Sequence, residues 1–257
     1  MRMDDIPLWA LFIGSVVIVV GTIELGYLVG KEARRRKEDE KEAPVSAIAG
    51  TVLALLAFIL AFTFGIVANR YDVRRELVRE QANAISTAYD RTDFLPAAMG
   101  DESKDLFRTY VDTIIYVGNA DNVAELATKI GEIKVIESRL WEIAVANVQG
   151  GDTTDIAALY VDSLNQMNNV LATRIAVAVE SRLPNELWIM LYLLVGLAMV
   201  AVGYQTAIAN SQRTWMLVVL ALSFSIVIVL IAALDDPERG YIAISQQPLR
   251  DARSGMS

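Results

Sequence analysis

Residues 47–79 constrain the fold more than any other stretch of this chain. Residues 47–68 contain no charged side chain, and this run is as long as the roughly 20 apolar residues that a helix needs to cross a bilayer. From residue 69 onward charged side chains become frequent, but no proline or glycine interrupts the sequence before residue 79. The pattern predicts one continuous helix that crosses a membrane and continues into a polar domain.

Three further segments are long and apolar enough to cross a bilayer, which gives four expected spans at residues 6–30, 44–68, 187–210 and 214–234. The first two pair as a hairpin over residues 6–68, and the last two pair over residues 187–234. Hydrophobic residues make up 54% of the chain and charged residues only 21%, a balance typical of integral membrane proteins. We therefore expect a multi-pass protein that lies in the lipid bilayer.

The residues between the hairpins, 69–186, mix polar and apolar side chains at helical spacing. The spacing predicts four soluble helices packed as a bundle, with breaks next to Pro96, Gly118 and Gly150. No alternating strand pattern competes with it. The expected fold class is therefore all-α, with four transmembrane helices and a helical bundle inserted between spans two and three.

The residue types that the chain lacks restrict its function. It contains no cysteine and no histidine, which removes disulfides, thiolate and imidazole metal sites, and the commonest general base near neutral pH. Its net charge of −8 argues against nucleic acid as a partner, because phosphate binding needs clustered Lys and Arg. No phosphate-binding loop, dinucleotide fingerprint or nucleophile elbow is present. We expect neither an enzyme nor an organic cofactor.

The second span presents a stripe of large apolar residues, Phe58, Phe62 and Ile66, at i, i+4, i+8 spacing. In a symmetric oligomer this large-residue stripe would form stacked apolar rings if it faced the axis, which is the layout of a hydrophobic gate. The alternative is ordinary packing against lipid or against another helix of the same chain. Sequence spacing alone leaves both interpretations open.

A second stripe lies beside the first, formed by the small residues Ala57, Ala61 and Gly65. Such a small-residue stripe allows a neighbouring helix to approach closely. In the first span, Glu24 is the one ionisable residue. It is either a pore-lining or ion-coordinating carboxylate, or a carboxylate that pairs with basic residues near the membrane surface, Arg34 or Arg35.

Residues 235–257 form a C-terminal tail in which apolar residues, among them Leu249, indicate docking onto another part of the protein. At its start lie three acidic residues, Asp235, Asp236 and Glu238. Their carboxylate oxygens suit a hard cation such as Ca²⁺. The alternative is that the three side chains are simply solvated beside the membrane.

The positive charges orient the spans. Lysine and arginine are densest in the loop at residues 31–43, so the positive-inside rule places this loop in the cytoplasm and residues 69–186 outside. Arg70 and Arg74, on the other side of the second span, favour the reverse orientation, but the charge there is less dense.

Short motifs along nearly the whole chain are similar to those of the bestrophin-like domain family of bacterial membrane proteins. They are ELGYLVG at residues 24–30, AFTFG at 61–65, RYD at 70–72, LYLL at 191–194, GYQ at 203–205 and ISQQPL at 244–249. The family is named for its similarity to bestrophins, so the resemblance implies a protein of the bacterial cytoplasmic membrane with bestrophin architecture. That architecture is a homo-pentamer with a pore lined by the second span.

Bestrophins are chiefly anion channels with an apolar neck on the second span, and the large-residue stripe matches this neck in spacing and residue type. They also bind calcium through an acidic cluster after the fourth span together with the N-terminal segment. The three acids of the tail occupy a comparable place in this sequence. Bestrophins keep the inserted helices in the cytosol, which is opposite to the orientation that the charges predict here.

The expected function is an oligomeric channel for inorganic ions. Anions are the first expectation by resemblance, while the acidic balance and Glu24 leave cations open. The alternative is a membrane-anchored sensor or scaffold that conducts nothing and whose helical bundle binds a partner.

Overall fold

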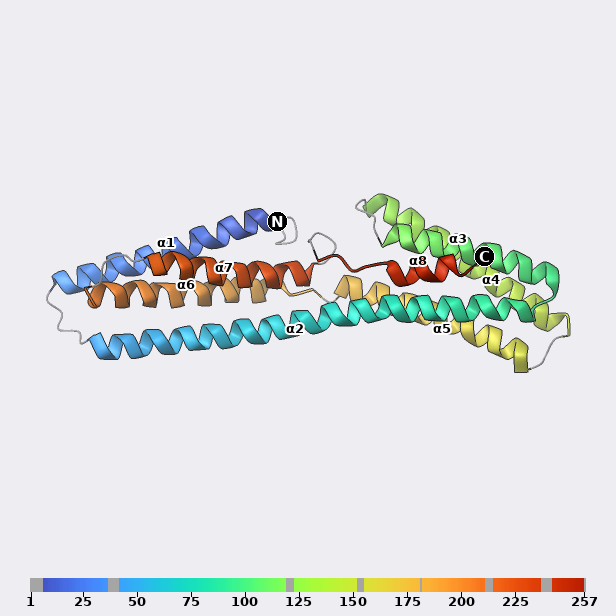
Figure 1. Cartoon of the computed structure of the whole chain (residues 1–257), viewed down its shortest axis with the longest axis horizontal. Coiled ribbons are helices and arrows are strands. Elements are labelled where there is room, and N and C mark those ends of the chain that lie inside the picture. Colours follow the sequence, from blue (N-terminus) through green and yellow to red (C-terminus); the bar gives the residue numbers. More distant parts are fainter. Residues whose placement is uncertain are drawn as a thin grey trace. The chain divides into compact units, whose positions relative to one another are not determined.

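The computed structural model describes residues 7–36, 42–118, 123–151, 155–180, 182–210, 215–236 and 242–256. Within these ranges the chain is helical and contains no strand, which confirms the expected all-α class. The helices are α1 (Leu8–Arg35), α2 (Glu42–Asp90), η2 (Arg91–Phe94), α3 (Ala97–Val117), α4 (Val123–Gln149), α5 (Asp155–Glu180), α6 (Asn185–Ile208), α7 (Trp215–Asp235) and α8 (Gln247–Ser254) (Figure 1).

The chain divides into two compact units. The first consists of Met1–Tyr71 and Arg182–Ala243, and the second of Asp72–Ser181 and Ile244–Ser257. Helix α2 contributes its first part to one unit and its second part to the other, because it continues from Glu42 to Asp90 without a break. The continuous helix expected over residues 47–79 is therefore present, and it is longer than expected.

Four helices of the first unit, α1, α2, α6 and α7, are long and apolar enough to cross a membrane, which confirms the four expected spans. Helix α1 continues five residues past the expected end of its span. The added residues have high helix propensity, and Glu32 pairs with Arg35 at 3.6 Å and with Arg36 at 3.2 Å. The beginning of the expected loop is thus a charged extension of the first span.

Glycine residues set the close approach of α1 and α6. A Cβ atom added to Gly26 would lie 2.1 Å from the Val200 carbonyl oxygen, and one added to Gly203 would lie 2.0 Å from the Ile23 carbonyl oxygen. On the same pair of helices, the Ser15 and Tyr192 hydroxyls lie 2.7 Å apart in a hydrogen bond. Backbones this close require the absence of side chains, so the two helices form one tightly packed pair.

In the first unit, α2 buries the face that contains Leu56, Leu60 and Val67, whose side chains are at most 3% exposed. These residues share one apolar cluster with residues of α6 and α7. Near the start of α2, the Gln205 amide donates a hydrogen bond to the Ser46 hydroxyl at 3.0 Å. This leaves the opposite face of α2 available for contacts outside the chain.

The second unit has its own core, which includes Phe107 and Tyr110 of α3, Leu140 of α4 and Tyr160 of α5. All four are at most 1% exposed. Helix α3 begins after Pro96, while α3 and α4 end next to Gly118 and Gly150, where the sequence indicated breaks. Apolar residues at helical spacing on each helix face this core.

The C-terminal segment docks onto the second unit, as the tail's apolar residues indicated. We call residues 244–256 the C-terminal strap. Leu249 is fully buried in the core of this unit and Met256 is 3% exposed. Arg108 of α3 donates from Nε to the Met256 carbonyl oxygen at 2.9 Å, and Arg253 lies 2.9 Å from Asp112 of the same helix.

Candidate pore-lining site

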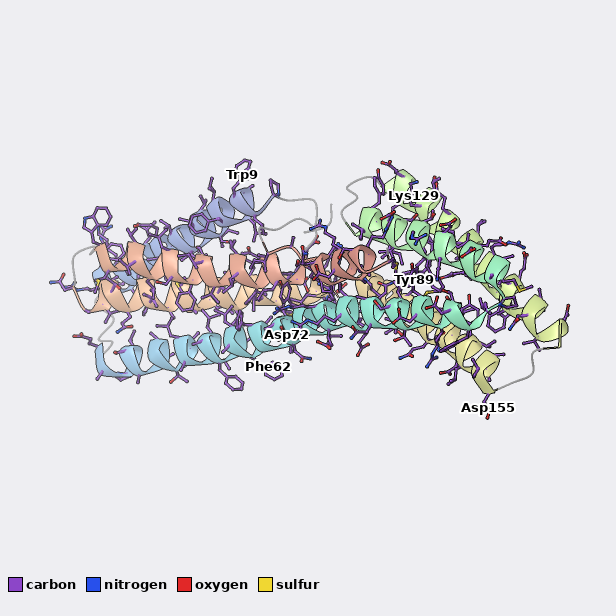
Figure 2. All side chains as sticks on the ribbon, turned by 45° about the vertical axis from the view of Figure 1, so that its right-hand side comes forward. Trp9, Phe62, Asp72, Tyr89, Lys129 and Asp155 are labelled. Carbon is purple, nitrogen blue, oxygen red and sulfur yellow. The ribbon has the colours of Figure 1, made fainter. Side chains whose placement is uncertain are left out.

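The large-residue stripe lies on the exposed side of α2. Phe58 is 66% exposed and Phe62 is 61% exposed, and Ile66 is also exposed. The rings of Phe58 and Phe62 stack with centroids 6.5 Å apart and an interplanar angle of 15°. Figure 2 shows Phe62 pointing away from the other helices of the first unit. Within one chain, the two aromatic rings of the stripe therefore pack against each other.

The small-residue stripe is exposed as well. Ala57, Ala61 and Gly65 all lie on the open side of α2, and a Cβ atom added to Gly65 would meet no atom within 4 Å. No helix in the described part of the chain uses this stripe for close packing. Close approach by a helix of another copy stays a prediction.

Glu24 lies on α1 and is half-buried. The two arginines considered as its partners have other contacts. Arg34 donates a hydrogen bond to the Asn210 side chain, and Arg35 pairs with Glu32. Helix α1 packs against α6 and α7, whereas the large-residue stripe lies on α2. The role of Glu24 as a pore-lining carboxylate stays a prediction.

The first two acids of the tail contact protein groups. Asp235 is 4% exposed, and its two carboxylate oxygens lie 3.0 and 3.1 Å from the Leu183 amide nitrogen, which donates to them. Asp236 faces the Arg182 guanidinium, with two nitrogen–oxygen distances of 3.5 Å. We call these four residues the α7 clasp. The third acid of the predicted cation site, Glu238, lies outside the described residues.

Bestrophin architecture implies a calcium ion at the position of the α7 clasp, so the surroundings of its carboxylates can be compared with those of a calcium site. Calcium sites surround the ion with oxygen ligands at 2.3–2.6 Å, and several of these are usually carboxylate oxygens. Here a backbone N–H and a guanidinium already approach the two described carboxylates. The described surroundings of Asp235 and Asp236 therefore suit hydrogen-bond donors and a cationic side chain, and a calcium site that includes Glu238 stays a prediction.

A polar network crosses the second unit. Arg174 of α5 donates to the Gln81 side-chain oxygen on α2 and to the Gln246 side-chain oxygen in the C-terminal strap, the latter at 2.8 Å. The Tyr110 hydroxyl donates to Glu137 at 3.1 Å. Burial raises the pKa of Glu137, although the Tyr110 hydrogen bond opposes the shift. Burial, reinforced by the Glu137 charge, also raises the pKa of Tyr110 well above its ordinary value.

Comparison with known proteins identifies the family. The profile of the Bestrophin-like domain matches residues 13–249. The chain belongs to the bestrophin-like domain family. No curated protein gives a significant match.

The fold of this bestrophin-like protein is that of bacterial bestrophin homologues. A crystal structure of a homologue from Klebsiella pneumoniae with one substitution is similar with a TM-score of 0.69 at 15% identity, covering 95% of this chain and 97% of that one. A crystal structure of a membrane protein variant is similar with a TM-score of 0.68 at 14% identity, over 95% and 97% of the two chains. A further variant of the Klebsiella pneumoniae homologue gives 0.63 at 16% identity, over 95% and 96%.

Two features of this bestrophin-like protein escaped the sequence analysis. The α1–α6 contact has a sequence signal, since Gly26 and Gly30 form a Gly-xxx-Gly pair that resembles the small-residue spacing of α2. Arg182 and Leu183 lie more than 50 residues before their partners Asp235 and Asp236. No local spacing in the sequence indicates that contact.

Proposed function

We propose that this bestrophin-like protein forms an oligomeric ion channel in which α2 lines the pore. Phe58, Phe62 and Ile66 form its apolar constriction in this proposal, and identical stripes from several copies surround the axis. The observation that supports it best is the exposure of this stripe on a helix whose opposite face is buried. A ring of large apolar side chains closes a pore by excluding water.

The small-residue stripe supports the same assembly. Ala57, Ala61 and Gly65 are exposed beside the constriction, where a helix of the next copy would approach closely. Assembly as a homo-pentamer follows from the resemblance to bestrophins. The lipid bilayer covers the remaining apolar surface of the spans.

Anions are the first candidates for the conducted ion, again by resemblance, and the net charge of −8 keeps cations as the second. The chain acts in this proposal as a conductor and not as an enzyme. It contains no histidine or cysteine that would serve as base or nucleophile.

Reconstitution tests the proposal. Purified protein in liposomes is expected to dissipate a chloride gradient, a potassium gradient or both, and native mass spectrometry is expected to give a multiple of the chain mass. The choice between the two gradients identifies the ion class. Flux equal to that of empty liposomes, together with a monomeric mass, would contradict the channel.

We further propose that the charged loop at residues 31–43 is cytoplasmic in the bacterial inner membrane and that residues 69–186 lie outside. Arg34, Arg35 and Arg36 at the end of α1 support this orientation. The chain has no cysteine, so a single Arg35→Cys substitution provides a clean probe. The introduced thiol is expected to resist a membrane-impermeant maleimide in intact cells. Rapid labelling would show that the loop lies outside and that the orientation is the reverse.

A non-conducting sensor or scaffold remains the second candidate. It is favoured by an open cavity of about 320 Å³ in the second unit, lined by polar residues of α2 and α5 that include Glu80, Asp162 and Asn169. Such a surface suits a polar partner. A protein that binds a partner through this cavity and shows no flux in liposomes would support the scaffold over the channel.

A further inference from the structure

Two carboxylates at the C-terminal end of α7 need hydrogen-bond donors or positive charge close to them. Asp235 and Asp236 are placed where the partial negative charge of the helix C-terminus disfavours further carboxylates. Asp235 is 4% exposed, so water does not compensate its charge. A cation, a set of hydrogen-bond donors, or both must therefore lie close to these side chains.

The segment before α6 provides both. Pro184 has an extended backbone (φ −58°, ψ 145°) and is the N-cap of α6, which leaves the Leu183 N–H outside the helix. That N–H donates to both oxygens of Asp235. Next to it, the two terminal nitrogens of Arg182 face the two oxygens of Asp236, each at 3.5 Å. The side chain of Asp236 is 13% exposed and that of Arg182 is 30% exposed.

We infer that Arg182 is a built-in cation that closes the α7 clasp and makes it independent of divalent metal ions. The guanidinium lies against the Asp236 carboxylate as an ion pair, with one long hydrogen bond to Oδ1 and no hydrogen bond to Oδ2. A metal ion bound to the same oxygens would have to displace it. Its positive charge also repels a divalent ion from Asp236 at close range. The inference does not depend on whether the protein conducts ions.

The clasp joins two distant parts of the chain inside the first unit. Asp235 and Asp236 follow the last span, while Arg182 and Leu183 precede the third span. In this role the Arg182–Asp236 pair holds the end of α7 against the start of α6 whether or not a metal ion is present. A clasp made by a metal ion would instead open when the ion is removed.

Thermal unfolding of the purified full-length protein in detergent tests the inference, with each sample measured in calcium chloride and in EDTA. The wild-type Tm is expected to be the same in both. Arg182→Gln and Asp236→Asn are each expected to lower it by roughly 4–8 °C. The double variant is expected to lose no more than the worse single variant, because both changes break one pair.

The matched control is Arg79→Gln, since Arg79 is an exposed arginine 3.2 Å from Glu76. Its expected shift is about 1 °C or less. Arg182→Lys, which keeps the charge, serves as a second variant if Arg182→Gln does not fold, and it is expected to lose less than Asp236→Asn.

Two results would overturn the inference. One is a calcium-dependent rise in the wild-type Tm that Asp236→Asn abolishes, which would make the acids a metal site. The other is an Arg182→Gln variant with the wild-type Tm, which would show that the guanidinium does not stabilise the contact between α7 and α6.

Discussion

Gly203 determines, at the level of a single atom, how closely α1 and α6 can approach. A Cβ atom at this position would lie 2.0 Å from the Ile23 carbonyl oxygen and 2.8 Å from the Tyr27 amide nitrogen. Both are backbone atoms of a helix and cannot rotate away. Gly203→Ala is therefore expected to lower the free energy of unfolding by about 1–3 kcal/mol, because the two helices must separate.

The control for this substitution is Gly14→Ala. A Cβ atom at Gly14 would meet no atom within 4 Å, and alanine is favoured over glycine in a helix by about 1 kcal/mol. Thermal unfolding is expected to give a lower Tm for Gly203→Ala and an equal or higher Tm for Gly14→Ala. Equal Tm values for Gly203→Ala and the wild type would refute the close packing.

Glu137 makes the stability of the second unit depend on pH. Burial raises its pKa above the ordinary value of 4.5, so the folded chain binds this proton more tightly than the unfolded chain. The stability that follows is complete below about pH 4.5 and is lost as the pH rises through the folded-state pKa. Glu137→Gln retains a carbonyl acceptor for the Tyr110 hydroxyl without the charge.

Between pH 4.5 and pH 7, the Tm of Glu137→Gln is therefore expected to increase relative to the Tm of the wild type. The control is Glu142→Gln on the same helix, whose carboxylate is exposed and lies 2.9 Å from Arg139. A difference for Glu137→Gln that stays constant across this range would contradict the shift in its pKa.

Among the structural elements, the C-terminal strap stabilises the second unit most clearly through Leu249. This side chain is fully buried, and Gln246 beside it accepts a hydrogen bond from Arg174 at 2.8 Å. Gln246 also passes so close to Gly118 that an added Cβ atom would lie 2.8 Å from it. These contacts make the strap a part of the bundle core.

Leu249→Ala is expected to lower the free energy of unfolding of this unit by about 2–5 kcal/mol, because it leaves a cavity beside α3. Hydrogen–deuterium exchange is expected to accelerate in α3 and in the strap, while α1 in the other unit serves as an internal reference. Arg250→Ala, at an exposed neighbouring position, is the control. Exchange in α3 that is equal in the two variants would show that the strap does not stabilise the bundle.

The elements themselves could be predicted because their signals are local. Uncharged runs marked the four spans, and Pro96, Gly118 and Gly150 marked the breaks between helices of the bundle. The spacing of the large-residue stripe could be found in the sequence, but its exposure could not, because exposure depends on which face of α2 packs against α6 and α7. The contacts of Arg182 and Arg174 could not be predicted, because each joins residues far apart in the chain through side chains that have several possible partners.

At the scale of the whole molecule, the proposed channel and a lone membrane anchor differ in what covers the exposed side of α2, which is other copies of the chain in the channel and lipid in the anchor. Phe64 lies on the same helix as Phe62 but two residues away, so the two rings point to different faces. Phe64 is 37% exposed and Phe62 is 61% exposed. Removing each ring in turn therefore tests which face of α2 lines the pore, because both substitutions remove one phenylalanine from the same helix.

The most direct test of the channel compares ion flux through three proteins in liposomes at equal protein density: the wild type, Phe62→Ala and Phe64→Ala. Loss of a ring from the constriction is expected to raise the flux several-fold for Phe62→Ala, because a wider apolar gate admits water more easily. Phe64→Ala is expected to match the wild type. Equal flux for all three proteins, or a rise confined to Phe64→Ala, would contradict a pore closed by the large-residue stripe of α2.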